Sequence, residues 1–247
     1  MLHTGVLDDL GRSIAWGEIR PATVLTIAGL EERYEVSRSV VREAVRVLES
    51  MRMVAPRRRV GLTVRPRSEW NALDVRLITW NLAGPARQRE LGALMELRVA
   101  IEPVAARLAA THADDDERDR LAALAARLRE LGSAGLGESP EYLAVDIEFH
   151  TLILRSSGNE MFAGTLGDVI GEVLAGRTRL GLSPSEPVAE ALDLHEIAAG
   201  ALLDRDGAAA EEAVRGIVLE AHRSALAEGA LGDVPEPDGP VRKTGRA

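Results

Sequence analysis

The sequence predicts a mainly α-helical protein, with a winged helix-turn-helix at the N-terminus and an all-helical antiparallel bundle after it. Three observations lead to this fold class. An arginine-striped helix precedes a basic hairpin within the first 68 residues, and from residue 70 onward the chain is rich in Ala and Leu without a convincing strand. The charge also changes sign, since residues 1–68 hold twelve basic and eight acidic residues, whereas the remainder holds eighteen and thirty-one. We therefore expect domains at 1–68 and 69–228, followed by a disordered tail at 229–247.

The N-terminal unit is expected to begin with three helices. Residues 5–16 form the first, and Pro21 interrupts the segment after it. The second spans 26–34, the turn Glu35-Val36 follows, and the third spans 37–51. Two short helices and a tight turn thus precede one strongly patterned helix.

The third helix has two distinct faces. Its apolar face carries five aliphatic residues, Val40, Val41, Ala44, Val45 and Leu48. Another face carries arginines at i, i+4 and i+8, namely Arg38, Arg42 and Arg46. One side is expected to pack and the other to present guanidinium groups.

Two short strands, 53–56 and 60–64, are expected to flank Arg57, Arg58 and Arg59 as a basic wing. Helix, turn, arginine-rich helix and basic hairpin follow in the order that a winged helix-turn-helix needs to place one helix in the DNA major groove.

The second domain is expected to contain seven helices joined by short connections. Residues rich in Gly, Pro, Asn and Asp separate them. The expected ranges are 70–82, 88–111, 115–131, 139–156, 160–179, 186–204 and 207–228.

Composition excludes several classes of protein. No apolar run approaches the roughly eighteen residues of a membrane span, and the N-terminus lacks the pattern of a secretory signal, so we expect a cytoplasmic protein with no membrane partner. The chain has no cysteine, which excludes disulfides, thiolate metal sites and cysteine nucleophiles. Any metal must be held by histidine, carboxylate or water.

The segment VSRSVVREAVRVLESMRMVAPRRRVGLTV resembles the DNA-binding domain of the GntR family over roughly the first 66 residues. The resemblance implies that Ser37, Arg38, Ser39 and Arg42 face DNA and that Arg58 and Arg59 of the wing reach the adjacent groove or backbone. Two positions depart from the family pattern: Arg59 replaces a usual glycine, and Ala22 follows Pro21 where the family has Pro-Gly.

Histidine placement points to a metal site in the second domain. Asp146 and His150 are four residues apart and share one helix face beside apolar positions, although a solvent-facing pair is the common alternative. His195 and His222 lie on the next-to-last and last helices. Relative to the turn at Asp206 their spacing differs by five residues, or roughly 7 Å of helix rise, so spacing permits convergence without requiring it.

Three further segments resemble the FCD effector domain of FadR-type GntR regulators over residues 70–228: LMELRVAIEPVAARLAA, DIEFHTLILRSSGNEMF and LHEIAAGALLDRDGAAAEEAVRGIVLEAH. This resemblance implies a divalent metal held by Asp146, His150, His195 and His222. Zinc is the leading expectation, and nickel, iron and manganese also suit these ligands.

The same resemblance implies that Arg98 faces the pocket and binds an effector carboxylate, with Arg177 as a second anionic contact. The alternative for Arg98 is a surface ion pair with Glu96 or Glu102. Asn159 is expected to cap a helix after Gly158. The stretch 73–82, with Trp80 and Asn81, resembles that of members responding to sugar acids, which favours an effector such as gluconate or galactonate.

These features predict a homodimeric transcriptional regulator, by default a repressor, that binds a palindromic operator and responds to a small carboxylate. Two alternatives remain. The metal site could be purely structural or sense the metal itself, in which case a carboxylate would not change DNA affinity. A metal-dependent hydrolase is the other, although the sequence has no H-E-x-x-H motif and His195 and Glu196 diverge on a helix.

Overall fold

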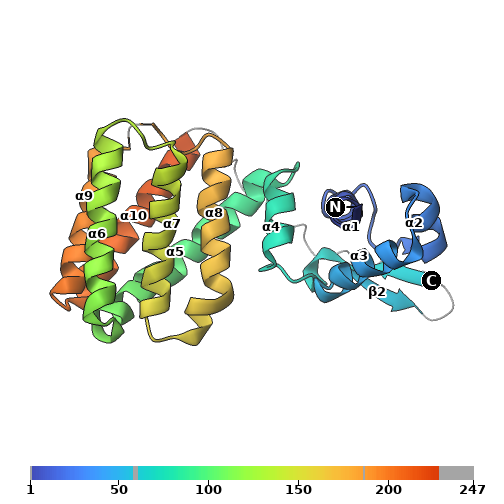
Figure 1. Ribbon diagram of the computed structural model, residues 1–247, viewed down its shortest axis with the longest axis horizontal. Coiled ribbons are helices and arrows are strands. Elements are labelled where there is room, and N and C mark those ends of the chain that lie inside the picture. The colour runs from blue at the N-terminus through green and yellow to red at the C-terminus, as the bar shows by residue number, and fades with distance from the viewer. Residues whose placement is uncertain (1, 58–60, 186, 228–247) are drawn as a thin grey trace, which may run out of the picture.

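The computed structural model describes residues 2–57, 61–185 and 187–227. The chain forms two lobes joined by one short helix, as Figure 1 shows. The N-terminal lobe contains α1 (Leu2–Ala15), α2 (Ile27–Tyr34) and α3 (Arg38–Ser50), together with a small sheet. The C-terminal lobe is all helical in its described part, so the predicted mainly α fold is confirmed.

The sheet has three antiparallel strands in the order β1-β3-β2. Strands β2 (Val54–Arg57) and β3 (Gly61–Val64) pair with Val54 opposite Val64. The sequence pattern predicts these two strands but not β1 (Val24–Leu25), which pairs with the other edge of β3. A two-residue strand is too short to produce a periodic pattern.

The turn before α2 contains Ala22 with φ 66°, in the left-handed region. This is the position where the sequence departs from the Pro-Gly pattern. The backbone therefore adopts here a conformation that favours glycine although the residue is alanine.

Helix α3 packs its apolar face into the N-terminal core, since Val41, Ala44, Val45 and Leu48 are all buried. Its opposite side is exposed. The two-faced pattern of the sequence therefore determines how α3 is oriented.

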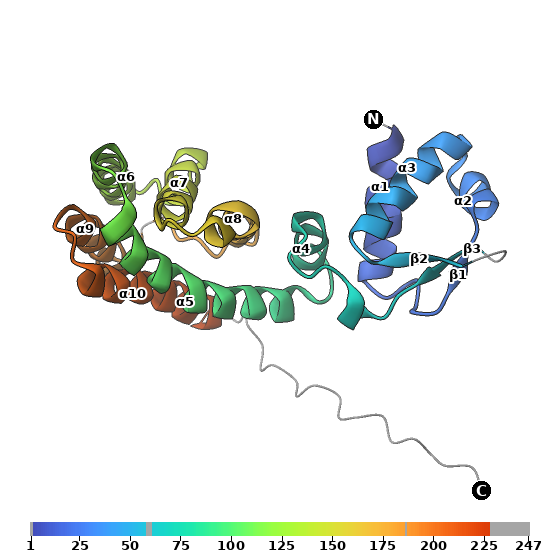
Figure 2. The ribbon, with the colours of Figure 1, turned by 90° about the horizontal axis from the view of Figure 1, so that it is seen from below.

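A 3-10 turn, η1 (Arg67–Glu69), leads to α4 (Val75–Leu82). The expected helix 70–82 begins five residues late because Asp74 caps it, with its carboxylate accepting from the Arg76 and Leu77 amides. Helix α4 lies between the two lobes (Figure 2). Leu77 and Trp80 belong to the N-terminal core, whereas Ile78 and Leu82 belong to a core of the bundle.

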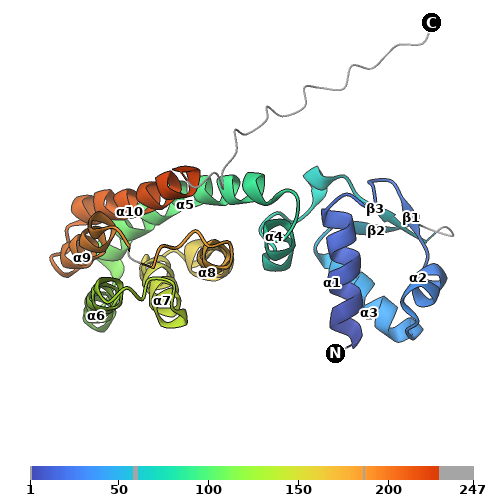
Figure 3. The same ribbon diagram turned by 90° about the horizontal axis from the view of Figure 1, so that it is seen from above.

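The bundle has two layers (Figure 3). One contains α5 (Arg87–His112), α9 (Ala189–Leu203) and α10 (Gly207–Ala227), and the other contains α6 (Asp115–Ser133), α7 (Pro140–Ser156) and α8 (Gly167–Arg179). Buried Leu, Ile, Phe and Ala side chains fill the space between them.

The single helix expected over 160–179 is interrupted. A π-helical turn, η2 (Phe162–Leu166), precedes α8, and Gly164 has non-helical angles of φ −85° and ψ −117°. Glycine accepts this conformation at little steric cost, which accounts for the break. Asn159 caps the turn as expected, since its Oδ1 accepts from the Met161 amide at 3.0 Å.

Candidate functional site

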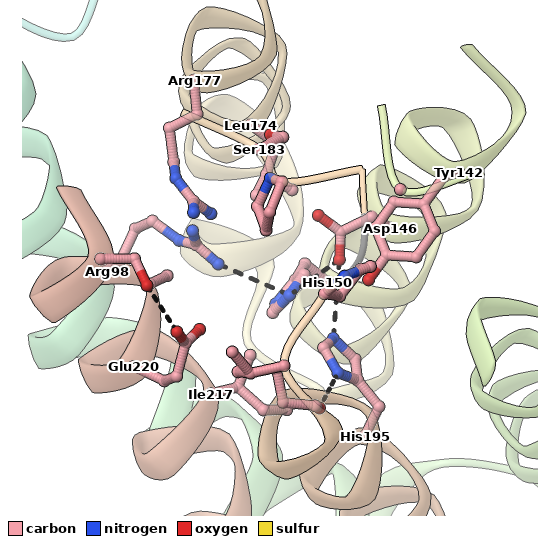
Figure 4. A pocket seen from close by; sticks show the side chains of 17 residues that line it. Arg98, Tyr142, Asp146, His150, Leu174, Arg177, Ser183, His195, Ile217 and Glu220 are labelled. Carbon is pink, nitrogen blue, oxygen red and sulfur yellow. Dashed lines mark hydrogen bonds and ion pairs between the residues drawn. The ribbon is translucent and has the colours of Figure 1, made fainter. Parts of the chain in front are cut away.

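A pocket inside the bundle gathers residues from five helices and two loops. It is a cavity of about 70 Å³ between the two layers (Figure 4). The polar residues that line it are Arg98, Tyr142, Asp146, His150, Arg177, Ser183, His195, Glu220 and Ser224.

Asp146, His150 and His195 form a compact cluster at this pocket. Their potential ligand atoms all lie within 4.8 Å of one another. Asp146 Oδ1 is 3.5 Å from His150 Nε2 and 3.5 Å from His195 Nε2. Three of the four expected metal ligands are thus brought together from α7 and α9.

Both imidazoles are held by contacts on their Nδ1 side. His195 Nδ1 lies 2.7 Å from the Ala191 carbonyl oxygen, and His150 Nδ1 lies 2.6 Å from Glu102 Oε2. The Ala191 carbonyl at His195 Nδ1 favours the tautomer that leaves His195 Nε2 free for a cation, as is usual for metal-binding histidines. His195 Nε2 is buried without a hydrogen-bond partner among the described residues.

The fourth expected ligand, His222, is not part of this cluster. It is partly buried on α10 and does not line the pocket. Helix α10 instead contributes Ile217, Glu220, Ala221 and Ser224 to the lining. An apolar Ile217 on this helix cannot ligate a metal.

The cluster fits a divalent metal held by three protein ligands. Two ligand atoms each about 2.0–2.2 Å from one ion are at most about 4.4 Å apart, and the 3.5 Å separations satisfy this limit. The orphaned His195 Nε2 and the carboxylate supply the nitrogen and oxygen donors that zinc accepts. Three protein ligands would leave at least one coordination position open.

Arg98 is buried to 1% exposure and pairs with Glu102, which sequence reasoning considered only as a surface partner. The Arg98 Nη2 to Glu102 Oε2 distance is 3.3 Å, and Nη2 also lies 3.5 Å from His150 Nε2. Burial alone would raise the pKa of Glu102, but the charges of Arg98 and His150 lower it to about 2. Glu102 therefore holds both an arginine and an imidazole in place.

Arg177 lines the same pocket from α8. Its Nη2 donates to the Leu182 carbonyl at 3.3 Å. Arg98 and Arg177 both line the cavity, and burial and then the charge of Arg98 lower the pKa of Arg177. Arg98 Nη1 and Arg177 Nε are both buried without a hydrogen-bond partner in the described part of the chain. Such donors require an anion or water.

The expected DNA-reading residues lie on the exposed side of α3. Ser37, Arg38, Ser39 and Arg42 are all exposed. Ser37 is the N-cap residue, and its hydroxyl makes no capping hydrogen bond. Arg46 pairs with Glu43, whereas Arg38 and Arg42 have no ion pair within the described ranges. Two arginines and a free helix N-terminus thus face solvent together.

The wing residues Arg58 and Arg59 lie outside the described residues. The adjoining strand ends are described, and Arg57 at the end of β2 is exposed opposite Gly61.

Trp80 and Asn81, which suggested a sugar-acid effector, lie at the junction of the lobes and do not line the pocket. Trp80 Nε1 donates to Asp8 Oδ1 at 3.3 Å, and Trp16 Nε1 donates to the Trp80 carbonyl at 2.8 Å. The sequence pattern gave no sign of this junction.

The junction also connects to the helix that carries Arg177. Thr79 of α4 donates to Glu172 Oε1 of α8 at 2.9 Å. Helix α8 is thus linked to the DNA-binding lobe by direct contacts through α4 and Trp80.

No helix within the described ranges is long and apolar enough to cross a membrane. A basic lobe with a helix-turn-helix, joined to a helical lobe whose internal pocket is lined by charged and polar side chains, is typical of two-domain DNA-binding regulators.

Comparison with known proteins gives the family. The model for bacterial regulatory proteins of the gntR family matches residues 2–64, and the FCD domain model matches residues 93–220. The chain belongs to the GntR family and carries an FCD domain, and it is therefore a DNA-binding transcriptional regulator and not an enzyme.

Two curated relatives from Escherichia coli (strain K12) align over most of the chain. The uncharacterized HTH-type transcriptional regulator YieP is 32% identical, over 85% of this chain and 90% of its own. The galactonate operon transcriptional repressor is 30% identical, over 87% of this chain and 92% of its own.

A solved structure described as Lar, which controls expression of the Listeria monocytogenes agr system, has the same fold. Its TM-score is 0.55 at 16% identity, and the match covers 92% of this chain and 97% of that one.

Proposed function

We propose that this regulator is a repressor whose DNA binding is controlled by a small carboxylate bound beside a divalent metal in the FCD pocket. The observation that carries the proposal is the set of unsatisfied buried donors around one cavity, Arg98 Nη1 and Arg177 Nε, next to the Asp146, His150 and His195 cluster. The two buried guanidinium N–H groups need an acceptor, which a carboxylate bound beside the metal would supply.

Asp146, His150 and His195 would hold the metal, with zinc as the leading candidate and nickel, iron or manganese as alternatives. When bound, the metal supplies positive charge and open coordination positions for an effector oxygen. Arg98 and Arg177 bind and orient the carboxylate, and Glu102 keeps Arg98 and His150 in position.

A sugar acid such as gluconate or galactonate is the effector class we favour. The supporting observation is that a relative 30% identical to this chain is named a galactonate operon repressor. For DNA, we propose that Ser37, Arg38, Ser39 and Arg42 contact the operator in a homodimer on a palindromic site, with Arg58 and Arg59 contributing from the wing. Arg38 and Arg42 are exposed and form no ion pair with a described residue, so they are available for base edges or phosphates.

Elemental analysis tests the metal site first. We expect about one divalent ion per chain in the wild type, loss of the ion in His195→Ala, and retention in His222→Ala. Loss of the ion in both histidine variants would instead support a four-ligand site that includes His222. A wild type that takes up no zinc, nickel or manganese would exclude the metal.

The alternative, a structural or metal-sensing site, is supported by the same compact cluster. The effector-controlled and metal-only functions are distinguished by measuring DNA affinity at saturating metal, with and without gluconate or galactonate. An unchanged affinity favours the alternative.

A further inference from the structure

One carboxylate lines the pocket without belonging to the metal cluster. Among the described lining residues the acidic ones are Asp146 and Glu220, and only Asp146 is a candidate ligand. Glu220 comes from α10, and Figure 4 shows it on a different side of the cavity from Asp146 and His195. The established activity gives this side chain no role.

Glu220 is held in place by one contact. Ser224 donates its hydroxyl to Glu220 Oε1 at 2.6 Å, and no hydrogen bond to Oε2 comes from a described residue. Glu220 lines the same cavity as Arg177 and Tyr142. Its charge partly opposes the lowering of the Arg177 pKa and adds to the raised pKa of Tyr142. Glu220 therefore acts on whatever Arg177 binds.

Charge balance indicates which ligands the pocket accepts. We count Glu102, which does not line the cavity but pairs with Arg98, and take both imidazoles as neutral metal ligands. The ionised side chains are then Arg98 and Arg177 against Glu102, Asp146 and Glu220, an excess of one negative charge. A divalent cation changes this to an excess of one positive charge. A monocarboxylate then neutralises the site, whereas a dicarboxylate leaves a net negative charge in a partly buried space, where uncompensated charge is costly.

Hydrogen-bonding chemistry points the same way. An ionised carboxylate only accepts hydrogen bonds. A ligand O–H group can therefore donate to Glu220, whereas a second carboxylate on the ligand would be repelled by it.

We propose that Glu220 makes the pocket selective for hydroxylated monocarboxylates and rejects dicarboxylates of the same length. This inference rests on the proposed function, because it takes the pocket to be the effector site. It makes Glu220 a specificity-determining residue in addition to the arginines and the metal.

The test compares D-gluconate with D-glucarate, which has the same carbon skeleton but a carboxylate in place of the terminal CH₂OH. Affinities of both acids for the zinc-loaded full chain are measured by titration calorimetry. We expect the wild type to bind gluconate at least about tenfold more tightly than glucarate. In Glu220→Gln this ratio should fall at least about tenfold, partly because glucarate binds more tightly. Glu212→Gln, which removes the same charge from an exposed position of α10, should leave the ratio unchanged.

Equal affinities in the wild type, or the same ratio in Glu220→Gln, would overturn the selectivity role of Glu220 while leaving the effector pocket standing. Failure of the zinc-loaded wild type to bind either acid would overturn the sugar-acid effector itself, and this inference with it. The wild-type ratio tests the claim even if the Glu220 variant does not fold.

Discussion

The indole ring of Trp80 occupies the space beside Gly11, so that a β-carbon on residue 11 would lie 2.2 Å from its Cη2 atom. In a second contact of this kind the roles are exchanged: Trp16, just after α1, packs on Gly84, just after α4, and a β-carbon on Gly84 would lie 2.1 Å from Trp16 Nε1. These two reciprocal contacts hold α4 against α1 and so connect the bundle to the DNA-binding lobe.

Gly11→Ala should therefore disturb the junction. Because the added methyl overlaps a buried ring that cannot simply swing away, we expect a loss of about 1–3 kcal/mol in the free energy of unfolding, measured by denaturant titration. Gly5→Ala on the same helix is the control, because nothing lies within 4 Å of its added β-carbon. That variant should gain up to about 1 kcal/mol from helix propensity. Equal effects of the two changes would contradict the packing account.

Ala22 provides a second test of stability. Its φ of 66° is unfavourable for alanine, so Ala22→Gly should raise the free energy of unfolding by about 1 kcal/mol. Gly17 is the matched control, since at φ 81° in open space the change Gly17→Ala should lower stability by a similar amount. A destabilising Ala22→Gly, seen as a lower Tm, would show that the turn is not strained.

The buried pair Arg98 and Glu102 predicts a double-mutant result. Arg98→Met leaves the Glu102 carboxylate buried with only His150 beside it, and should cost about 3–5 kcal/mol of stability. Arg98→Met combined with Glu102→Leu removes both charges and should recover much of that loss. If the double variant is as unstable as the sum of the single ones, the two side chains do not act as a pair.

Arg177 separates effector binding from metal binding. It lines the pocket outside the ligand cluster, so Arg177→Gln should retain the metal but weaken gluconate binding about 10- to 100-fold, as expected when one charge-assisted contact is lost. Calorimetry measures gluconate binding, and elemental analysis of the same sample measures the metal content. Arg155→Gln, an exposed change on α7, should alter neither. Metal loss in Arg177→Gln would show that the two functions are not separable.

On the DNA-binding face, Arg38→Ala and Arg42→Ala should each weaken DNA binding by about 1–3 kcal/mol in a fluorescence anisotropy titration. Arg46→Ala is the comparison, because Arg46 is already paired with Glu43 and should contribute less. If an arginine contacts phosphate and not a base, its loss should also reduce the salt dependence by about one counterion. A stronger effect of Arg46 than of Arg38 and Arg42 would contradict the proposed face.

The sequence predicted most of the fold because its helices are strongly patterned. The two faces of α3 and the arginine stripe were visible in its residues alone, and the separators Gly158 and Asp206 placed helix boundaries within a few residues. Strand β1 was missed because two residues carry no periodicity. The kink at Gly164 was missed because a glycine within a helical pattern is usually tolerated.

The site was predictable only in part. Asp146 and His150 share a helix face by simple spacing, and His195 meets them across helices. His222 was included by resemblance, whereas the helix rotation that brings Ile217, Glu220 and Ser224 to the pocket depends on packing of α10 against its neighbours. Glu102 lies one turn after Arg98, and this spacing marks it as an ion-pair partner, but the burial of the pair depends on helix packing.

The most direct test of the account is the affinity of the zinc-loaded protein for DNA that it selects from a random library, measured with and without gluconate at a concentration that saturates the pocket by calorimetry. We expect gluconate to weaken DNA binding about 5- to 150-fold in the wild type, the usual range of coupling between two sites, and to have a smaller effect on Arg177→Gln at that concentration. A DNA affinity that stays the same while gluconate fills the pocket would contradict the claim that this site controls DNA binding.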